Sequence, residues 1–212
     1  LPLFSTLRPY RIVIWRVNDS FYRANDSIPI AQQNFLRQYL DAGGSFFMAS
    51  MEIISRLGAV SFRSNVLHVQ QFAPNPNGCP CPACDENVGV ARVEGVDSDP
   101  ISRGVRATLD YSQYPEENIF LCLIGPDRSD TFTSSPNAAS ILFSSVSGKA
   151  CGVRYPRTGQ DSTGRVVFCS FPLDAIPENG TAPKNRAAFL RNVIQFLTPG
   201  LGGLGTIALD QG

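Results

Sequence analysis

Hydrophobic and polar residues switch between strand-like and helix-like patterns near the start of the chain. Residues 10–17, YRIVIWRV, form an apolar run rich in β-branched residues, which predicts a buried strand. Pro29 suits the first position of a helix, and apolar residues then recur at helical spacing until Gly43 and Gly44. These apolar residues are Phe35, Leu36, Tyr39 and Leu40. SFFMA at 45–49 follows, and this strand–helix–strand order predicts parallel strands with a helix packed on the sheet.

After a loop at residues 73–87 that is rich in Pro, Asn and Cys, the apolar pattern becomes that of short strands. The β-type runs are VGVARVEGV, GVRATLDY, NIFLCLIG, AASILFSSV, KACGVRYP and RVVFCSF. A last helix is predicted at residues 184–197, and its apolar face consists of Phe189, Val193, Phe196 and Leu197. The pattern therefore predicts an α/β fold whose C-terminal half adds antiparallel strands to the sheet.

Length and charge exclude several classes of protein. With 212 residues, of which 43% are hydrophobic, the chain is long enough to bury one sizeable core. Its 18 basic residues balance 18 acidic ones and form no cluster, so nucleic acid is not an expected partner. The longest apolar runs fall far short of the roughly 20 residues that cross a bilayer, so no membrane insertion is expected.

The cysteine content indicates the compartment. Six cysteines, an even number, suit an oxidising environment, and the chain is poor in lysine and rich in proline. We therefore expect an extracellular or cell-surface location. The chain opens at Leu1 without the features of a signal peptide, which predicts that it is processed or excised from a longer protein.

Several segments, taken in order, resemble the class I glutamine amidotransferase-like family. The matching pieces are YRIVIW, LRQYLDAGGSFFMASMEI, GVDSDPISRG and GRVVFCSFPLDAI followed by a helix. The resemblance implies a three-layer, flavodoxin-like sheet flanked by helices. It is greatest to the non-catalytic domains of large secreted bacterial proteins. It implies one domain at 1–198, which lacks its first β-α-β unit, and a Gly-rich linker at 199–212 into a following domain.

The catalytic residues of that family are missing from the matching positions. Its enzymes place a cysteine in the elbow after the strand, where the helix N-terminus activates the thiol, and a histidine after a late strand. Here the elbow offers Ala49, Ser50 and Met51, while Phe171 stands in place of the histidine and Leu173 in place of the glutamate that follows it. The resemblance therefore implies no catalytic residues and no cofactor.

Ser50 has two interpretations. As a nucleophile it would need a base, for which Glu52 and the sole histidine, His68, are the weak candidates. Glu52 is too close in sequence to face Ser50 and fits better as a first-turn acid at the helix dipole. The favoured interpretation is that Ser50 caps the following helix. A polar cluster that converges on Ser50 would favour an enzyme, and a closed, apolar elbow would favour a non-catalytic domain.

The cysteines allow metal or disulfide chemistry. Cys79, Cys81 and Cys84 could hold zinc with His68 as the fourth ligand, although no second paired motif is present. The favoured alternative is a disulfide within 79–84 or from there to Cys122.

A second disulfide is predicted from a hairpin. The turn-rich stretch between KACGVRYP and RVVFCSF is centred on Gln160, which places Cys151 opposite Cys169 across an antiparallel pair. We therefore expect these two cysteines to be bonded.

Three functions remain open at this point. The first is a non-catalytic structural or interaction domain of a larger secreted or surface protein. The second is a hydrolase-like enzyme that uses Ser50 or a metal, and the third is a module that binds a small ligand or sugar above Ser50. Residues 1–9 are too short to supply a crossover unit before the first strand, so an open sheet edge is expected. The expected partners are other protein chains or neighbouring copies of this one.

Overall fold

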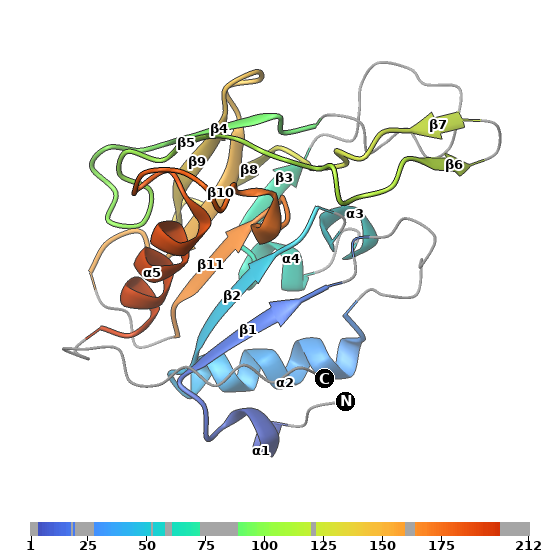
Figure 1. Ribbon diagram of the computed structural model, residues 1–212. Helices are drawn as coiled ribbons and strands as arrows, with labels where there is room; N and C mark the ends of the chain where they lie inside the picture. The colour runs from blue at the N-terminus through green and yellow to red at the C-terminus, as the bar shows by residue number, and fades with distance from the viewer. Residues whose placement is uncertain are drawn as a thin grey trace.

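The fold is a nine-stranded mixed sheet with helices on both faces (Figure 1). A computed structural model describes residues 4–17, 19, 28–51, 53–57, 61–72, 89–119, 122–159 and 164–199. The main strand order is β1-β2-β11-β10-β9-β4-β5. The bounds are β1 Ile12–Arg16, β2 Ser45–Ala49, β11 Val166–Cys169, β10 Ala150–Tyr155, β9 Ala139–Ser144, β4 Arg92–Gly95 and β5 Arg106–Thr108.

The parallel part of the sheet consists of β1, β2 and β11. Ile12 lies opposite Ser45, and Phe46 lies opposite Val166, in two parallel ladders. Helix α2, Ile30–Asp41, connects β1 to β2. The parallel pairing that the strand–helix–strand order predicts is therefore confirmed. The helix begins one residue later than expected, because Pro29 is its N-cap residue.

The C-terminal half adds antiparallel strands, as predicted. Strands β10, β9, β4 and β5 form successive antiparallel pairs, and β8, Phe132–Ser134, links β10 to β3, Val69–Phe72. The run NIFLCLIG does not join this sheet. Its described residues contribute to β6, Glu117–Ile119, and β7, Cys122–Ile124, which form an antiparallel pair of their own.

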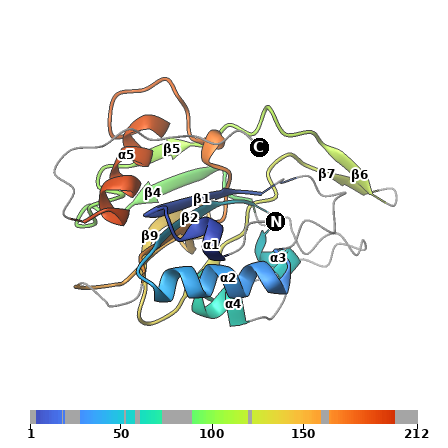
Figure 2. The same cartoon turned by 90° about the horizontal axis from the view of Figure 1, so that it is seen from below.

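Helices form the two outer layers (Figure 2). Helices α1 (Phe4–Leu7), α2, α3 (Ile53–Leu57) and α4 (Ser61–Asn65) lie on one face, and α5 (Arg186–Leu197) lies on the other. This arrangement confirms the three-layer, flavodoxin-like α/β fold class. None of the helices in the described ranges is long and apolar enough to cross a membrane.

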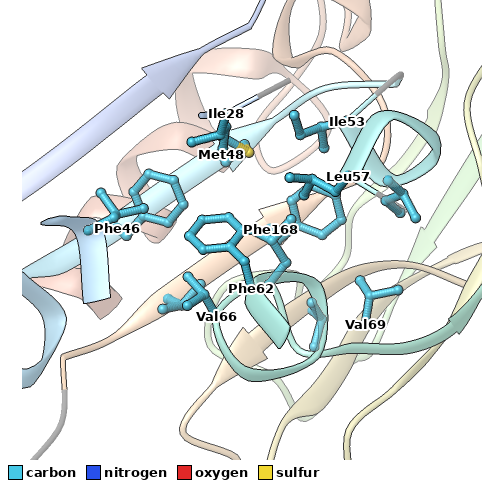
Figure 3. Packing of buried hydrophobic residues seen from close by; sticks show 14 of the residues in the cluster. Ile28, Phe46, Met48, Ile53, Leu57, Phe62, Val66, Val69 and Phe168 are labelled. Atoms are coloured by element: carbon cyan, nitrogen blue, oxygen red, sulfur yellow. The ribbon is translucent and has the colours of Figure 1, made fainter. Parts of the chain in front are cut away.

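Each face of the sheet buries its own apolar cluster, because side chains alternate along a strand. Phe46 and Met48 point to the layer of α2 to α4, where they meet Ile53 and Phe62 (Figure 3). Phe47 points the other way, into the cluster beneath α5. The members of that cluster on α5 are Phe189, Val193 and Leu197. At roughly 25 cal/mol per Å² of apolar surface, these two clusters supply most of the drive to fold.

The turn between α2 and β2 depends on its glycines. Gly43 has φ +91°, a left-handed conformation that favours glycine. A Cβ atom on Gly44 would come within 2.2 Å of the ring of Tyr39. The Tyr39 hydroxyl in turn donates to the main-chain oxygen of Tyr10 at 3.0 Å, so this close contact fixes the start of β1 beside the end of α2.

Candidate functional site

Polar residues meet at one edge of the parallel strands. Ser50 directly follows β2, Ser170 directly follows β11, and Asp19 comes shortly after β1. Because parallel strands have their carboxyl ends at the same edge, the three residues lie on one side of the sheet. This is the edge at which open α/β sheets bind their ligands.

Ser50 is engaged with the carboxylate of Asp19. Its hydroxyl donates to Asp19 Oδ1 at 2.6 Å, and the main-chain N–H of Met51 donates to the same oxygen at 3.1 Å. The Ser50 side chain is completely buried, and Asp19 is 7% exposed. Since α3 begins at Ile53, Ser50 lies in the strand-to-helix turn, as predicted. The acceptor that fixes its hydroxyl comes from the neighbouring strand's loop.

A buried arginine supports the loop that carries Asp19. The Arg128 side chain is fully buried, and it donates to the main-chain oxygens of Asp19 at 2.9 Å and Pro115 at 3.1 Å. The Ser170 hydroxyl donates to the main-chain oxygen of Asp130. A guanidinium carries five donors in a fixed fork, so Arg128 holds two separate loops at the same edge.

A tyrosine and an aspartate lie at the rim of this polar cluster. The Tyr114 hydroxyl donates to the carboxylate of Asp174, which also pairs with the exposed Arg16 at 3.4 Å. Burial, and then the hydrogen bond to Asp174 and the charges of Asp174 and Asp19, raise the pKa of Tyr114 well above its ordinary value. The phenol therefore remains a donor at physiological pH and is not a base.

The two groups at Ser50 that acyl transfer would need, a hydroxyl and a main-chain N–H, are both hydrogen-bonded to Asp19. In a nucleophile elbow, the hydroxyl attacks and the N–H of the next residue stabilises the oxyanion. Here the Asp19 carboxylate accepts from the Ser50 hydroxyl and from the Met51 N–H together. A substrate oxyanion would have to displace a carboxylate that Arg128 helps to hold in place. The turn has the form of an elbow and is closed by Asp19.

The structure places His68 at the other end of the strands. His68 stacks on Tyr155, Tyr155 lies opposite Val166, and Val166 lies opposite Phe46, at the amino end of β2. Ser50 is four residues further along, which at the rise of an extended strand is roughly 13 Å. His68 therefore does not reach the Ser50 hydroxyl. Burial lowers the pKa of His68 to about 4, with the Asn137 side chain opposing that shift.

The two residues that replace the family's histidine and glutamate pack in or against the apolar cluster beneath α5. Phe171 is fully buried in the cluster beneath α5. Leu173 begins a short 3-10 helix, η2, Leu173–Ala175, and packs at the border of the same cluster. An aromatic core residue thus fills the position from which the family's histidine would act.

Several other candidates lie outside the described residues. These are Glu52, Cys79, Cys81 and Cys84. Within the part of the chain that the structure describes, His, Cys, Asp and Glu form no group of three that could hold a metal ion. Of the four candidate zinc ligands, the structure describes only His68, which lies away from the polar edge.

The predicted disulfide between Cys151 and Cys169 is not formed, and both thiols are free and buried. The hairpin is antiparallel as expected, but Cys169 lies opposite Gly152, one residue away from the predicted register. The β10–β11 ladder runs without a register shift from Tyr155 opposite Val166 to Gly152 opposite Cys169, so the hairpin is centred half a residue beyond Gln160 and Cys151 does not face Cys169. The two cysteines still belong to the same apolar cluster.

Sequence reasoning missed Asp19 and Arg128. An acidic residue soon after the carboxyl end of the first strand is a usable signal, because that end faces the ligand-binding edge in α/β folds. Arg128 gives no comparable signal, since it reaches Asp19 across 109 positions of the chain. Only the folded arrangement brings that guanidinium to the edge.

Fold and site together define a flavodoxin-like α/β protein with a closed, polar strand-to-helix turn. No protein-family model matches the chain, and no curated protein is significantly similar to it.

Solved structures share the fold at low sequence identity. The N-terminal domain of mmIFT52 is 14% identical with a TM-score of 0.55, covering 96% of this chain and 83% of that one. Two cytoplasmic proteins of Salmonella typhimurium are also similar. STM3548 is 14% identical with a TM-score of 0.52 (92% and 74% covered), and STM1381, from strain LT2, is 13% identical with a TM-score of 0.53 (94% and 77% covered). At these identities the likeness concerns the fold alone.

Proposed function

We propose that this chain is a non-catalytic domain, similar to the amidotransferase-like domains of multidomain proteins, that assembles through the edge strand β1. The closed turn at Ser50 supports the absence of catalysis, because Asp19 takes up both the hydroxyl and the N–H of Met51. A polar cluster does converge on Ser50, but its members are committed to one another within a buried site. For the same reason we do not favour a ligand site directly above Ser50.

The observation that carries the proposal is the position of β1. Within the described chain, β1 pairs with β2 and with no other strand. The N–H of Ser45 donates to the main-chain oxygen of Arg11 at 2.9 Å, which fixes the phase of that ladder. Since alternate residues of a parallel strand bond the same neighbour, the main-chain groups of Ile12, Ile14 and Arg16 face away from β2. Such an edge pairs readily with another strand.

The occupant that we propose is β1 of a second copy. Antiparallel pairing centred on Ile14 would place Ile14 against its counterpart and Ile12 against Arg16 of the second copy. No two arginines then lie opposite each other, whereas parallel pairing in register would oppose Arg16 to itself. Ile14 is 42% exposed, so the pairing would also remove apolar surface from water.

Sedimentation of the purified chain over a range of concentrations tests this assembly. The wild type is expected to dimerise, and Ile14→Pro is expected to be monomeric, because it removes an N–H that faces the open edge and leaves the β1–β2 ladder intact. Ile14→Val, which keeps the N–H, is the matched control and should still dimerise. A wild type that stays monomeric at all concentrations, or an Ile14→Pro variant that still dimerises, contradicts the proposal.

A fluorophosphonate probe tests the non-catalytic part. Such probes label activated serines, and we expect Ser50 to stay unlabelled in the folded protein because its hydroxyl is buried and bound to Asp19. Labelling of Ser50 that disappears in Ser50→Ala would instead support the hydrolase-like alternative.

The proposed setting is a larger secreted or cell-surface protein. Its support is the six cysteines and the resemblance to domains of that kind. Mass spectrometry of the unreduced protein from its native source would test it, with bonds among Cys79, Cys81, Cys84 and Cys122 expected. Fully reduced thiols at these positions would argue for a reducing compartment.

A further inference from the structure

A cavity lies at the edge of the sheet opposite to Ser50. It has a volume of about 540 Å³, within the range of roughly 300–1,000 Å³ that is typical of small-molecule sites. Its walls come from the end of α2, the turn from α4 into β3, the turn between β8 and β9, and the facing ends of β10 and β11. Four separate segments of the chain therefore converge on this space.

The inner wall consists of two stacked rings. The imidazole of His68 and the ring of Tyr155 are 4.2 Å apart and inclined by only 13°. His68 has φ +57°, and it is the one non-glycine residue of the described chain with positive φ. Backbone conformations of this kind are uncommon outside glycine and persist where the surrounding structure imposes them, often at ligand sites.

The His68 imidazole keeps unused hydrogen-bonding capacity. The side chain is 5% exposed, and its Nδ1 atom has no hydrogen-bond partner among the described residues. This atom is itself shielded from solvent, so a ligand in the cavity would meet the ring and not Nδ1. Burial lowers the pKa of His68 to about 4, so the ring is neutral, and the Asn137 side chain is already hydrogen-bonded to it.

The remaining walls determine the chemistry of the ligand. They include one cation, Arg37, and one anion, Asp41, so their formal charges cancel. The amide side chains of Asn65, Gln70 and Asn137 are exposed at the rim, and each offers both donors and acceptors. A phosphate would find a single guanidinium, and an apolar ligand would make no use of the amides. Uncharged groups that both donate and accept fit this lining best.

We propose that this cavity binds a neutral, hydroxyl-rich small molecule of the size of a mono- or disaccharide, with Tyr155 and the His68 ring as its apolar wall. Hydroxyls can bond to the rim amides while the carbon framework lies against the ring surfaces. The site is separate from the closed turn at Ser50 and from the β1 edge. Its existence therefore does not depend on the proposed assembly.

Saturation-transfer NMR tests this site with glucose, galactose, mannose and maltose as probes, and with inorganic phosphate and benzoate as charged and apolar comparisons. At least one sugar is expected to show transfer, and the two comparison compounds none. Asn137→Ala should weaken that sugar's affinity roughly tenfold through the loss of one side chain's hydrogen bonds. Asn65→Trp, which narrows the mouth from an exposed position, should abolish binding.

The matched control is Asn34→Ala, an exposed position on α2 that does not line the cavity and should bind as the wild type does. Circular dichroism of each variant ensures that the fold is kept. No transfer to any of the four sugars overturns the proposal. Equal binding by Asn137→Ala and Asn65→Trp, or transfer to phosphate or benzoate alone, overturns it as well.

Discussion

The carboxylate of Asp19 joins two turns that are 31 positions apart in the chain. It accepts from the Ser50 hydroxyl and from the Met51 N–H, and both donors are buried. A buried donor that loses its acceptor retains its full desolvation cost, which exceeds the net value of an ordinary hydrogen bond. At the scale of single residues, stability at this edge therefore depends more on the acceptor than on either donor.

This asymmetry predicts unequal effects of two alanine substitutions. Asp19→Ala should lower the free energy of unfolding by roughly 2–4 kcal/mol because it removes the carboxylate that accepts from two buried donors, whereas Ser50→Ala should cost about 1 kcal/mol. Urea denaturation measures both, and the double variant should cost less than the two single effects combined. If Ser50→Ala is as costly as Asp19→Ala, the carboxylate is not the organising group.

Among the elements, those with a local signal in the sequence were predictable. The apolar run at 45–49 became β2 with the same bounds, and the predicted helix at 184–197 is α5, which begins two residues later. Pairing was less predictable, because register depends on bulges and turns. The β10–β11 hairpin places Gly152, and not Cys151, opposite Cys169, and the run around Cys122 contributes to two strands that pair with each other.

The start of α5 depends on a local cap. The Asn185 side chain accepts from the N–H of Ala188 at 2.8 Å, which satisfies one of the free donors of the first turn. Asn185→Ala should lower the free energy of unfolding by about 1 kcal/mol, and Asn185→Asp, which keeps the acceptor, should cost much less. Thermal unfolding of the two variants checks this. Equal midpoints for both would show that the cap contributes little.

For the molecule as a whole, the sequence predicted the location of the polar site better than the residues that form it. The order of elements placed Ser50 at the carboxyl edge of the parallel strands, as the structure has it. Asp19 and Arg128 reach that edge through contacts between distant segments, and no local pattern encodes such contacts. The cavity beside His68 could not be predicted either, because four separate segments of the chain form its walls.

The single histidine gives the whole molecule a defined pH dependence. In the unfolded chain the His68 pKa is near 6.5, and burial lowers it to about 4 in the fold. Below pH 6.5 the unfolded chain therefore binds a proton that the native protein does not. The contribution of His68 is complete above pH 6.5, and it declines by about 3 kcal/mol as the pH falls to about 4.

Urea denaturation between pH 4 and pH 7 measures this loss. His68→Asn is the suitable control, because asparagine tolerates the left-handed backbone at this position. The carboxylates titrate in both proteins, so the difference between the two stability profiles isolates His68. Parallel profiles across this range would show that the pKa of His68 is not lowered in the native state.

The alkylation of the two free thiols of β10 and β11 can report how often the sheet opens. Cys151 and Cys169 are completely buried, and burial raises the pKa of both, so neither the thiolate nor access for an alkylating reagent exists in the native state. At high reagent concentration, alkylation should therefore proceed at the rate of opening and become independent of that concentration. Because the two strands are paired, both cysteines should gain their adducts together in peptide maps, and singly modified molecules should not accumulate. The time course would then give the rate at which the centre of the sheet opens in native buffer.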